Sequence, residues 1–231
     1  MVIARQKSAF LVFLAFLVFL LTYYVAPQFF LRLNIFGQFK LDYPILYSQL
    51  TVGLFSCILI LSLSDKIDFG LKVVNFNWRK VAWIVSCIEA IPLLIFLILF
   101  FSDELYLSSW MLLSLAEILV YHVILSPLIE EVFFRGVIQT LLSPLVSIKF
   151  EYRQFSVSLP LLITSVLFAL IHFQYSFTAI VFIFSLGVFC GHLRAKYQSI
   201  VPGIFAHFVF NLLAVFIPKI ILVIDQALSV G

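Results

Sequence analysis

Charged side chains are scarce in this chain. Lysine and arginine number 14 and aspartate and glutamate 11 among 231 residues, so that 11% of the sequence is charged and 64% is hydrophobic. A soluble domain needs a charged, solvated surface, which this composition does not supply. The mean hydropathy of +1.20 is typical of a protein that crosses the membrane several times. The sequence therefore predicts an all-α, polytopic membrane helix bundle.

Two further features are also missing. The three cysteines, Cys57, Cys87 and Cys190, lie in separate apolar runs without metal-type spacing, which argues against a disulfide framework. The apolar run after Arg5 and Lys7 has no Ala-x-Ala type exit, the mark of a cleavable signal. We expect this run to remain as the first helix.

Runs of roughly 20 apolar residues mark the expected spans. Seven are predicted, with two of them inside one charge-free run and joined near Gln174–Phe177: Ser8–Leu31, Tyr43–Ser64, Val81–Ser102, Leu105–Leu142, Gln154–Leu193 (two helices) and Tyr197–Pro218. Pro127 should divide and kink the overlong fourth run, because proline removes a helical hydrogen bond. Lys149–Arg153 is expected as a polar loop. The apolar tail Ile220–Val230 is too short to cross upright alone and leaves an eighth span open.

The basic residues are distributed unevenly over the expected loops. With a cytoplasmic N-terminus, ten fall inside and three outside: Arg5, Lys7, Lys66, Lys72, Arg79, Lys80, Lys149, Arg153, Arg194 and Lys196 against Arg32, Lys40 and Lys219. The positive-inside rule favours this orientation. We expect residues 1–104 to supply N-terminal helices and residues 105–231 the functional core of one bundle. The compact, Phe- and Ile-rich chain points to a bacterial inner membrane.

One apolar stretch carries three charges, Glu130, Glu131 and Arg135. An ionisable group inside a membrane span costs about 2.5–3.5 kcal/mol and is a functional-site candidate by default. Glu131 and Arg135 are four residues apart, share a helix face and can pair. Glu130 points about 100° away and stays without a local partner, as a carboxylate tunable for base catalysis. The alternative is a buried ion network that only fixes helix packing.

Two histidines and an asparagine complete the set of candidates. His172 lies deep in the fifth predicted span, and His207 and Asn211 share one face of the last. At about 1.5 Å per residue, Glu130 and His172 lie at similar depths, with Asn211 nearby and His207 nearer the cytoplasmic mouth. Glu89 and Glu117 could line a polar cavity or pair with hydroxyl groups. We interpret His122 and His192 as packing or interfacial residues.

The order of these motifs resembles a known family. Glu130-Glu131-x-x-x-Arg135, Phe168-x-x-x-His172 and His207-x-x-x-Asn211 resemble the CPBP family of CAAX prenyl proteases and bacteriocin-processing or bacteriocin-immunity proteins, also called Abi, over roughly residues 126–216. The resemblance implies an intramembrane glutamate-dependent endopeptidase. Glu130 would then activate a water with help from His172, His207 and Asn211 would hold the oxyanion, and Glu131 and Arg135 would support the site.

The chemistry agrees with this resemblance. Peptide hydrolysis needs a base, a proton donor and a polarised carbonyl group, and no serine or cysteine motif indicates a nucleophile, so direct water attack is preferred. The expected substrate is a hydrophobic, membrane-tethered or lipidated peptide, cleaved from the cytoplasmic side without cofactor, metal or nucleic acid. Two alternatives remain: a zinc protease using Glu130, His172 and His207, and a non-enzymatic scaffold, regulator or immunity protein.

Overall fold

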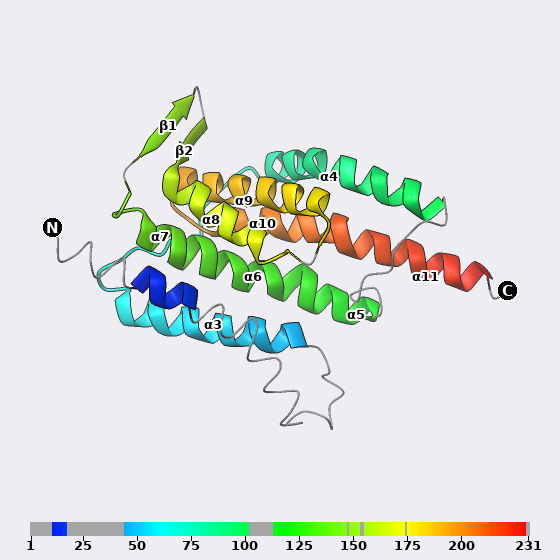
Figure 1. Cartoon of the computed structure of the whole chain (residues 1–231), viewed down its shortest axis with the longest axis horizontal. Helices are drawn as coiled ribbons and strands as arrows, with labels where there is room; N and C mark the ends of the chain where they lie inside the picture. Colours follow the sequence, from blue (N-terminus) through cyan, green and yellow to red (C-terminus); the bar gives the residue numbers. More distant parts are fainter. Residues whose placement is uncertain are drawn as a thin grey trace.

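The computed structural model describes residues 11–17, 44–101, 113–146, 148–152, 155–173 and 175–229. Figure 1 shows a bundle of long, roughly parallel or antiparallel helices, with a small β-hairpin at one end and the helix α11 at the other. The N-terminal part of the chain supplies α3 (Pro44–Leu63) and α4 (Trp78–Phe101). These confirm two of the expected helices. Most of the first span and the start of the fourth lie outside the described residues.

The fourth predicted run forms one helical rod from Leu115 to Leu142. It comprises α5 (Leu115–Glu117), η3 (Ile118–Leu125), α6 (Ser126–Glu131), η4 (Val132–Ile138) and α7 (Gln139–Leu142), where η marks π-helical hydrogen bonding. Ser114 and Glu117 form a capping box at its start, so Glu117 pairs with a hydroxyl group. Pro127 does not end the helix, contrary to the expected division, because the backbone on both sides stays in the right-handed helical region.

The segment expected as a polar loop is instead a β-hairpin. Strand β1 (Lys149–Tyr152) pairs antiparallel with β2 (Phe155–Ser158), with Lys149 opposite Ser158. The next helix, α8 (Leu159–Leu170), therefore begins later than the charge pattern indicated. Ser158 caps it by accepting a hydrogen bond from the Leu161 N–H, and a proline follows in the first turn. Absence of charge alone could not separate an apolar strand from a helix.

The last helices confirm the expected hairpin and show the course of the apolar tail, which the sequence had left open. Helix α9 (Phe177–Tyr197) begins after the Ser176 cap, close to the expected turn. Helix α10 (Val201–Asn211), η5 (Leu212–Phe216) and α11 (Ile217–Ser229) follow one another as a single helix. The tail thus prolongs the last helix and does not turn back as an eighth span. Pro218 lies inside it and does not stop it.

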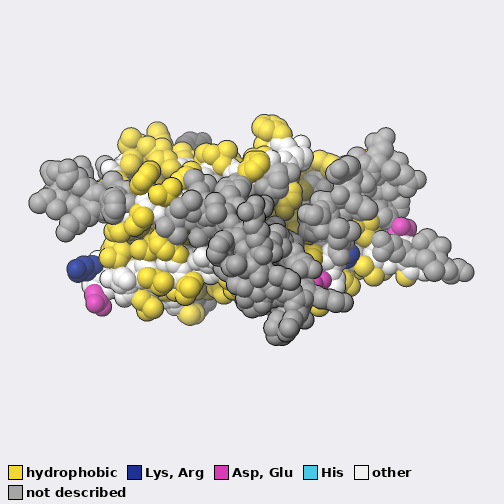
Figure 2. All heavy atoms as spheres, turned by 60° about the horizontal axis from the view of Figure 1, so that its bottom comes forward, with side chains coloured by type: hydrophobic (Ala, Val, Ile, Leu, Met, Phe, Trp, Pro, Cys, Tyr) yellow, Lys and Arg dark blue, Asp and Glu magenta, His cyan; other side chains and the backbone are white. Residues whose placement is uncertain are grey.

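Two helices in the described part of the chain are long and apolar enough to cross a membrane, Phe177–Tyr197 and Val201–Asp225. Large apolar side chains also lie on the outside, such as Leu61 at 78% and Trp83 at 70% exposed. Figure 2 shows apolar side chains over most of the visible described surface and few charged ones. Such a surface fits a lipid environment, because water would penalise it.

A loop between α3 and α4 closes the end of the bundle that carries the hairpin. Gly70 adopts φ +73°, a conformation that favours glycine. Its carbonyl accepts a hydrogen bond from the Ile200 N–H, and the Arg194 guanidinium donates to the Asp68 carbonyl at 3.1 Å. The loop is thereby fixed to the α9–α10 connection. We call this end of the molecule the hairpin end.

Candidate active site

Three helical segments bring the predicted residues together. Glu130 and Glu131 end α6, His172 follows α8, and His207 and Asn211 lie on α10. Glu130, His172, His207 and Asn211 all line one cavity of about 260 Å³, whereas Glu131 and Arg135 lie behind it. The structure thus gathers the four residues predicted to act on substrate and sets the two predicted supporting residues apart.

The Glu131–Arg135 pair is the buried foundation of the site. Arg135 Nε lies 3.4 Å from Glu131 Oε2, and both side chains are at most 1% exposed. The guanidinium also donates to the Gly187 carbonyl at 2.9 Å and lies 4.6 Å from the centroid of the Phe168 ring. These contacts compensate the charge of a buried arginine, which would otherwise be very costly. The predicted ion pair is confirmed.

Glu130 lines the cavity and has one carboxylate oxygen that accepts no hydrogen bond. Its Oε1 accepts a short hydrogen bond from the Ser126 hydroxyl, one helical turn earlier. Its Oε2 is buried, accepts no hydrogen bond and lies 4.0 Å from His207 Nε2. Glu130 thus has no ionic partner on its own helix, as predicted. Its hydrogen bond from the Ser126 hydroxyl was not predicted from the sequence. A carboxylate oxygen without a hydrogen bond is what a general base needs to take a proton from water.

His207 lies between the two glutamates. Its Nδ1 is 3.2 Å from Glu131 Oε1, and an ionised carboxylate only accepts hydrogen bonds, so Nδ1 carries a proton. Its Nε2 faces Glu130. If Nε2 is also to donate, the ring must be an imidazolium, and Glu131 supplies the compensating negative charge. His207 is therefore closer to Glu130 than the depth count from the sequence indicated.

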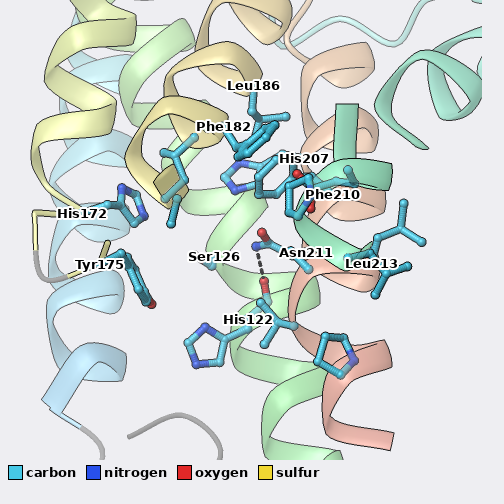
Figure 3. Close-up of a pocket in the computed structure, with 18 of the residues that line it drawn as sticks. His122, Ser126, His172, Tyr175, Phe182, Leu186, His207, Phe210, Asn211 and Leu213 are labelled. Carbon is cyan, nitrogen blue, oxygen red and sulfur yellow. Dashed lines mark hydrogen bonds between the residues drawn. The ribbon is translucent and has the colours of Figure 1, made fainter. Parts of the chain in front are cut away.

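His172 is oriented by its own helix. Its Nδ1 lies 2.8 Å from the Phe168 carbonyl oxygen, which can only accept, so the proton resides on Nδ1 and Nε2 has a free lone pair. The ring stacks on Tyr175, with centroids 5.9 Å apart. Figure 3 shows His172 and Tyr175 on one side of the cavity and His207 and Asn211 on the other. His172 can thus accept a proton from the cavity.

Asn211 is anchored by a carbonyl that the helix leaves available. In η3 the Ser126 N–H donates to the Tyr121 carbonyl, five residues back. In the same pattern, the donor to the His122 carbonyl would be the N–H of residue 127. That residue is Pro127, which has no N–H. The Asn211 Nδ2 donates to the His122 carbonyl instead, at 2.7 Å (Figure 3). One N–H of the Asn211 amide remains for a ligand, since the amide nitrogen carries two.

Further polar residues line the cavity, and Glu89 thereby follows the first of the two alternatives expected for it. Glu89 on α4 is 1% exposed with its Oε1 unbonded, and His122 and Tyr175 also face the cavity. Glu89 could be singled out in the sequence because it is a charged residue within an apolar span. Its position in the sequence, however, does not link it to the motifs of Glu130, His172 and His207. His122 was interpreted as a packing residue, and Tyr175 gave no signal.

The zinc alternative receives no support from this geometry. Across the described residues, no three His, Cys, Asp or Glu side chains are grouped closely enough to share a metal ion.

Fold and site first define a class: a helical, polytopic membrane protein with a polar cavity of Glu, His and Asn side chains inside its bundle. The chain belongs to the type II CAAX prenyl endopeptidase Rce1-like family, whose model matches residues 90–213, more than half of the sequence. This confirms the family resemblance and makes the protein a glutamate-dependent intramembrane protease. Searches of curated proteins and of solved structures found no significant match. Nothing in these comparisons supports a bacteriocin-immunity role.

Proposed function

We propose that this protein hydrolyses a peptide bond of a hydrophobic or lipidated, membrane-associated peptide by Glu130-activated water. One observation carries the proposal: Glu130, whose Oε2 accepts no hydrogen bond, lines a cavity shared with His172, His207 and Asn211. Glu130 takes the proton of the attacking water, and the lone pair of His172 assists its transfer to the leaving amine. No covalent acyl-enzyme is required.

His207 and Asn211 are the proposed oxyanion donors. The His207 Nε2–H, as an imidazolium held by Glu131, and the second N–H of the Asn211 amide point into the cavity from one helix. Each such donor contributes about 2.7–4 kcal/mol to transition-state stabilisation in related chemistry. Glu131 and Arg135 hold His207 in position and do not touch the substrate.

The proposal includes the wider arrangement of the chain. We propose seven spans with a cytoplasmic N-terminus in a bacterial inner membrane, with residues 1–104 supplying N-terminal helices and 105–231 the core. The family match begins at residue 90, within α4, and Glu89 of that helix lines the cavity. The last helix of the N-terminal part therefore belongs to the wall of the proposed site.

The test compares Glu130→Gln with a matched substitution. Purified protein in liposomes is incubated with a pool of hydrophobic and prenylated peptides, with and without a chelator, and new termini are read by mass spectrometry. Glu117→Gln is the control, because it makes the same change in the same helical rod at an exposed cap. We expect wild type and Glu117→Gln to cleave with or without chelator and Glu130→Gln to lose activity about 10²–10⁴-fold. Cleavage by Glu130→Gln at the wild-type rate would overturn the proposal.

A further inference from the structure

A second cavity lies at the hairpin end, apart from the cavity that holds Glu130. Its volume is about 770 Å³, within the range of about 300–1,000 Å³ that is usual for ligand pockets. Its walls are the ends of α7 and α9, the β-hairpin with the start of α8, and the loop before α4. Of its described lining residues, none belongs to the cavity at Glu130. The proposed hydrolysis makes no use of this space.

The lining of this second cavity carries more positive than negative charge. Its described charged members are three cations, Lys149, Arg194 and Lys196, against the single carboxylate of Asp68. That carboxylate already has a cationic partner outside the lining, because its Oδ2 lies 3.6 Å from Lys72 Nζ. A concave site lined mainly by one sign of charge concentrates counter-ions. The cavity therefore favours an anion.

Arg194 is built into the wall and is only 7% exposed. Its Nη2 donates to the Asp68 carbonyl at 3.1 Å and lies 3.4 Å from Thr140 Oγ1. In the described part of the chain both hydrogen bonds of this guanidinium come from Nη2, which leaves the N–H groups of Nη1 for a ligand. A guanidinium that is fixed in this way is well suited to phosphate oxygens.

Two exposed lysines and a hydroxyl group complete the set of donors. Among the described side chains, neither Lys149 nor Lys196 forms an ion pair with a carboxylate. Lys149 stands directly opposite Ser158 in the β-hairpin, and both line the cavity. The Ser158 hydroxyl oxygen accepts a hydrogen bond from the Leu161 N–H, so that its own O–H remains available to donate. Donors therefore reach the cavity from the hairpin and from α9.

The β-hairpin also indicates a lipid as the source of the anion. Side chains alternate along a strand, so Phe150 and its partner Val157 lie on the face opposite Lys149. Phe150 is 60% exposed and Ile148 is 51% exposed. Figure 1 shows the hairpin at the end of the bundle where α7 and α9 end. Exposed apolar side chains next to basic ones are typical of a segment that lies in the headgroup region of a membrane.

We propose that this second cavity binds the phosphate group of an anionic phospholipid headgroup. The Arg194 guanidinium and the two lysines pair with the phosphate oxygens, and the Ser158 hydroxyl donates a hydrogen bond. Basic pockets between the ends of membrane helices recognise such headgroups. A zwitterionic lipid such as phosphatidylcholine binds more weakly, because its quaternary ammonium group meets the same positive charges. Bound lipid connects α9 to the hairpin and stabilises this end of the molecule.

The test measures how lipids shift the melting temperature of the full chain in a neutral detergent. A ligand of the folded state raises the melting temperature with its concentration, which gives an apparent Kd. The probes are phosphatidylglycerol, phosphatidylcholine with the same acyl chains, and inorganic phosphate. Lys149→Gln with Lys196→Gln removes two charges from the lining. Lys66→Gln with Lys80→Gln is the matched control, because these lysines are equally exposed at the same end but do not line the cavity.

We expect phosphatidylglycerol to stabilise the wild type and the control pair more than phosphatidylcholine does. In Lys149→Gln with Lys196→Gln, the affinity for phosphatidylglycerol should fall about 30-fold, at about a factor of five per lysine. Arginine at both positions should restore it. Equal losses in the two glutamine pairs would indicate a diffuse surface attraction and overturn the proposal.

Inorganic phosphate separates the two sources of a phosphate group. We expect it to shift the melting temperature less than phosphatidylglycerol does at equal concentration. An equal shift would assign the cavity to a soluble phosphate and overturn the lipid as its ligand. Binding needs no turnover, so Glu130→Gln should bind phosphatidylglycerol in the same way as the wild type. Loss of cleavage activity therefore tests the proposed function and leaves this result unaffected.

Discussion

His207 shows how two adjacent glutamates can have different tasks. Glu131 contacts its Nδ1 and Arg135, and is fully buried, whereas Glu130 lines the cavity with its Oε2 4.0 Å from Nε2. A neutral His207 with its proton on Nδ1 could only accept at Nε2. The proposed oxyanion role therefore requires a proton on Nε2 as well, with the carboxylate of Glu131 beside the ring as its partner.

Glu131→Gln tests this dependence. Glutamine keeps one oxygen, which can still accept from His207 Nδ1, while its NH2 group replaces Oε2 beside Arg135 and the negative charge of the carboxylate is lost. We expect kcat to fall about 100-fold, comparable to the loss of one oxyanion donor, with little change in KM. Thermal unfolding in detergent checks the fold. A wild-type kcat would mean that His207 works as a neutral ring.

At the residue scale, the sequence predicted the members of the proposed site better than their contacts. Spacing of four along a helix was enough for the Glu131–Arg135 pair and for the shared face of His207 and Asn211, since helical geometry is local. The Ser126 hydroxyl on Glu130 and the place of Glu89 depend on how helices rotate against one another. A single sequence has no pattern from which this rotation of the helices can be predicted.

At the scale of the element, Pro127 acts through a missing hydrogen bond. The helix continues through Pro127, but the His122 carbonyl loses its backbone donor. The Asn211 side chain donates a hydrogen bond to this carbonyl instead. Proline was expected to divide the helix because it usually does so in α-helical backbone. In the π-helical segment η3, hydrogen bonds run five residues back, so the carbonyl that lacks a donor is that of His122. The hydropathy of the sequence does not reveal such π-helical segments.

Pro127→Ala should separate stability from activity. The new N–H can bond to the His122 carbonyl and compete with Asn211, so we expect a more stable helix, by up to about 3 kcal/mol, and a lower kcat. The measurements are the melting temperature and the cleavage rate. Pro144→Ala, in the turn after α7, is the control and should leave kcat unchanged. Unchanged kcat in Pro127→Ala would show that the anchor of Asn211 has no role in turnover.

The loop at Gly70 makes a prediction about stability alone. A Cβ at Gly70 would lie 2.5 Å from the Arg194 guanidinium carbon, and its φ of +73° is unfavourable for other residues by about 1–2 kcal/mol. Gly70→Ala should therefore lower the melting temperature. Gly53→Ala is the control, because the nearest side-chain atom there is at 3.4 Å and alanine favours a helix. Equal melting temperatures for the two variants would contradict this account.

At the scale of the whole molecule, composition and charge predicted a membrane helix bundle and the order of its helices in the described ranges. They did not predict the β-hairpin or the straight continuation of the last helix through Pro218. Both depend on packing against neighbours: Leu159 N–H bonds to the Ile148 carbonyl where the hairpin meets α8.

Orientation is the whole-molecule property to measure. In the proposed orientation the position after Ile148 is cytoplasmic, so we expect a fluorescent protein inserted there to fluoresce and alkaline phosphatase inserted there to be inactive. After Asp225 the two reporters should behave in the opposite way. The basic residues at the hairpin end, such as Lys149 and Arg194, are the physical reason. The reverse pattern would contradict the proposed orientation.

The buried ion pair behind the site also has an electrical consequence. Glu131 and Arg135 are at most 1% exposed and do not line the cavity, so the cavity ends at Glu130 on this side. Water in the cavity holds the potential of the side to which it opens, and the membrane voltage then falls across the packed residues behind Glu130. A proton that reaches Glu130 through the cavity crosses little of this voltage, whereas one from the opposite side of the membrane would cross nearly all of it, at about 2.3 kcal/mol per 100 mV.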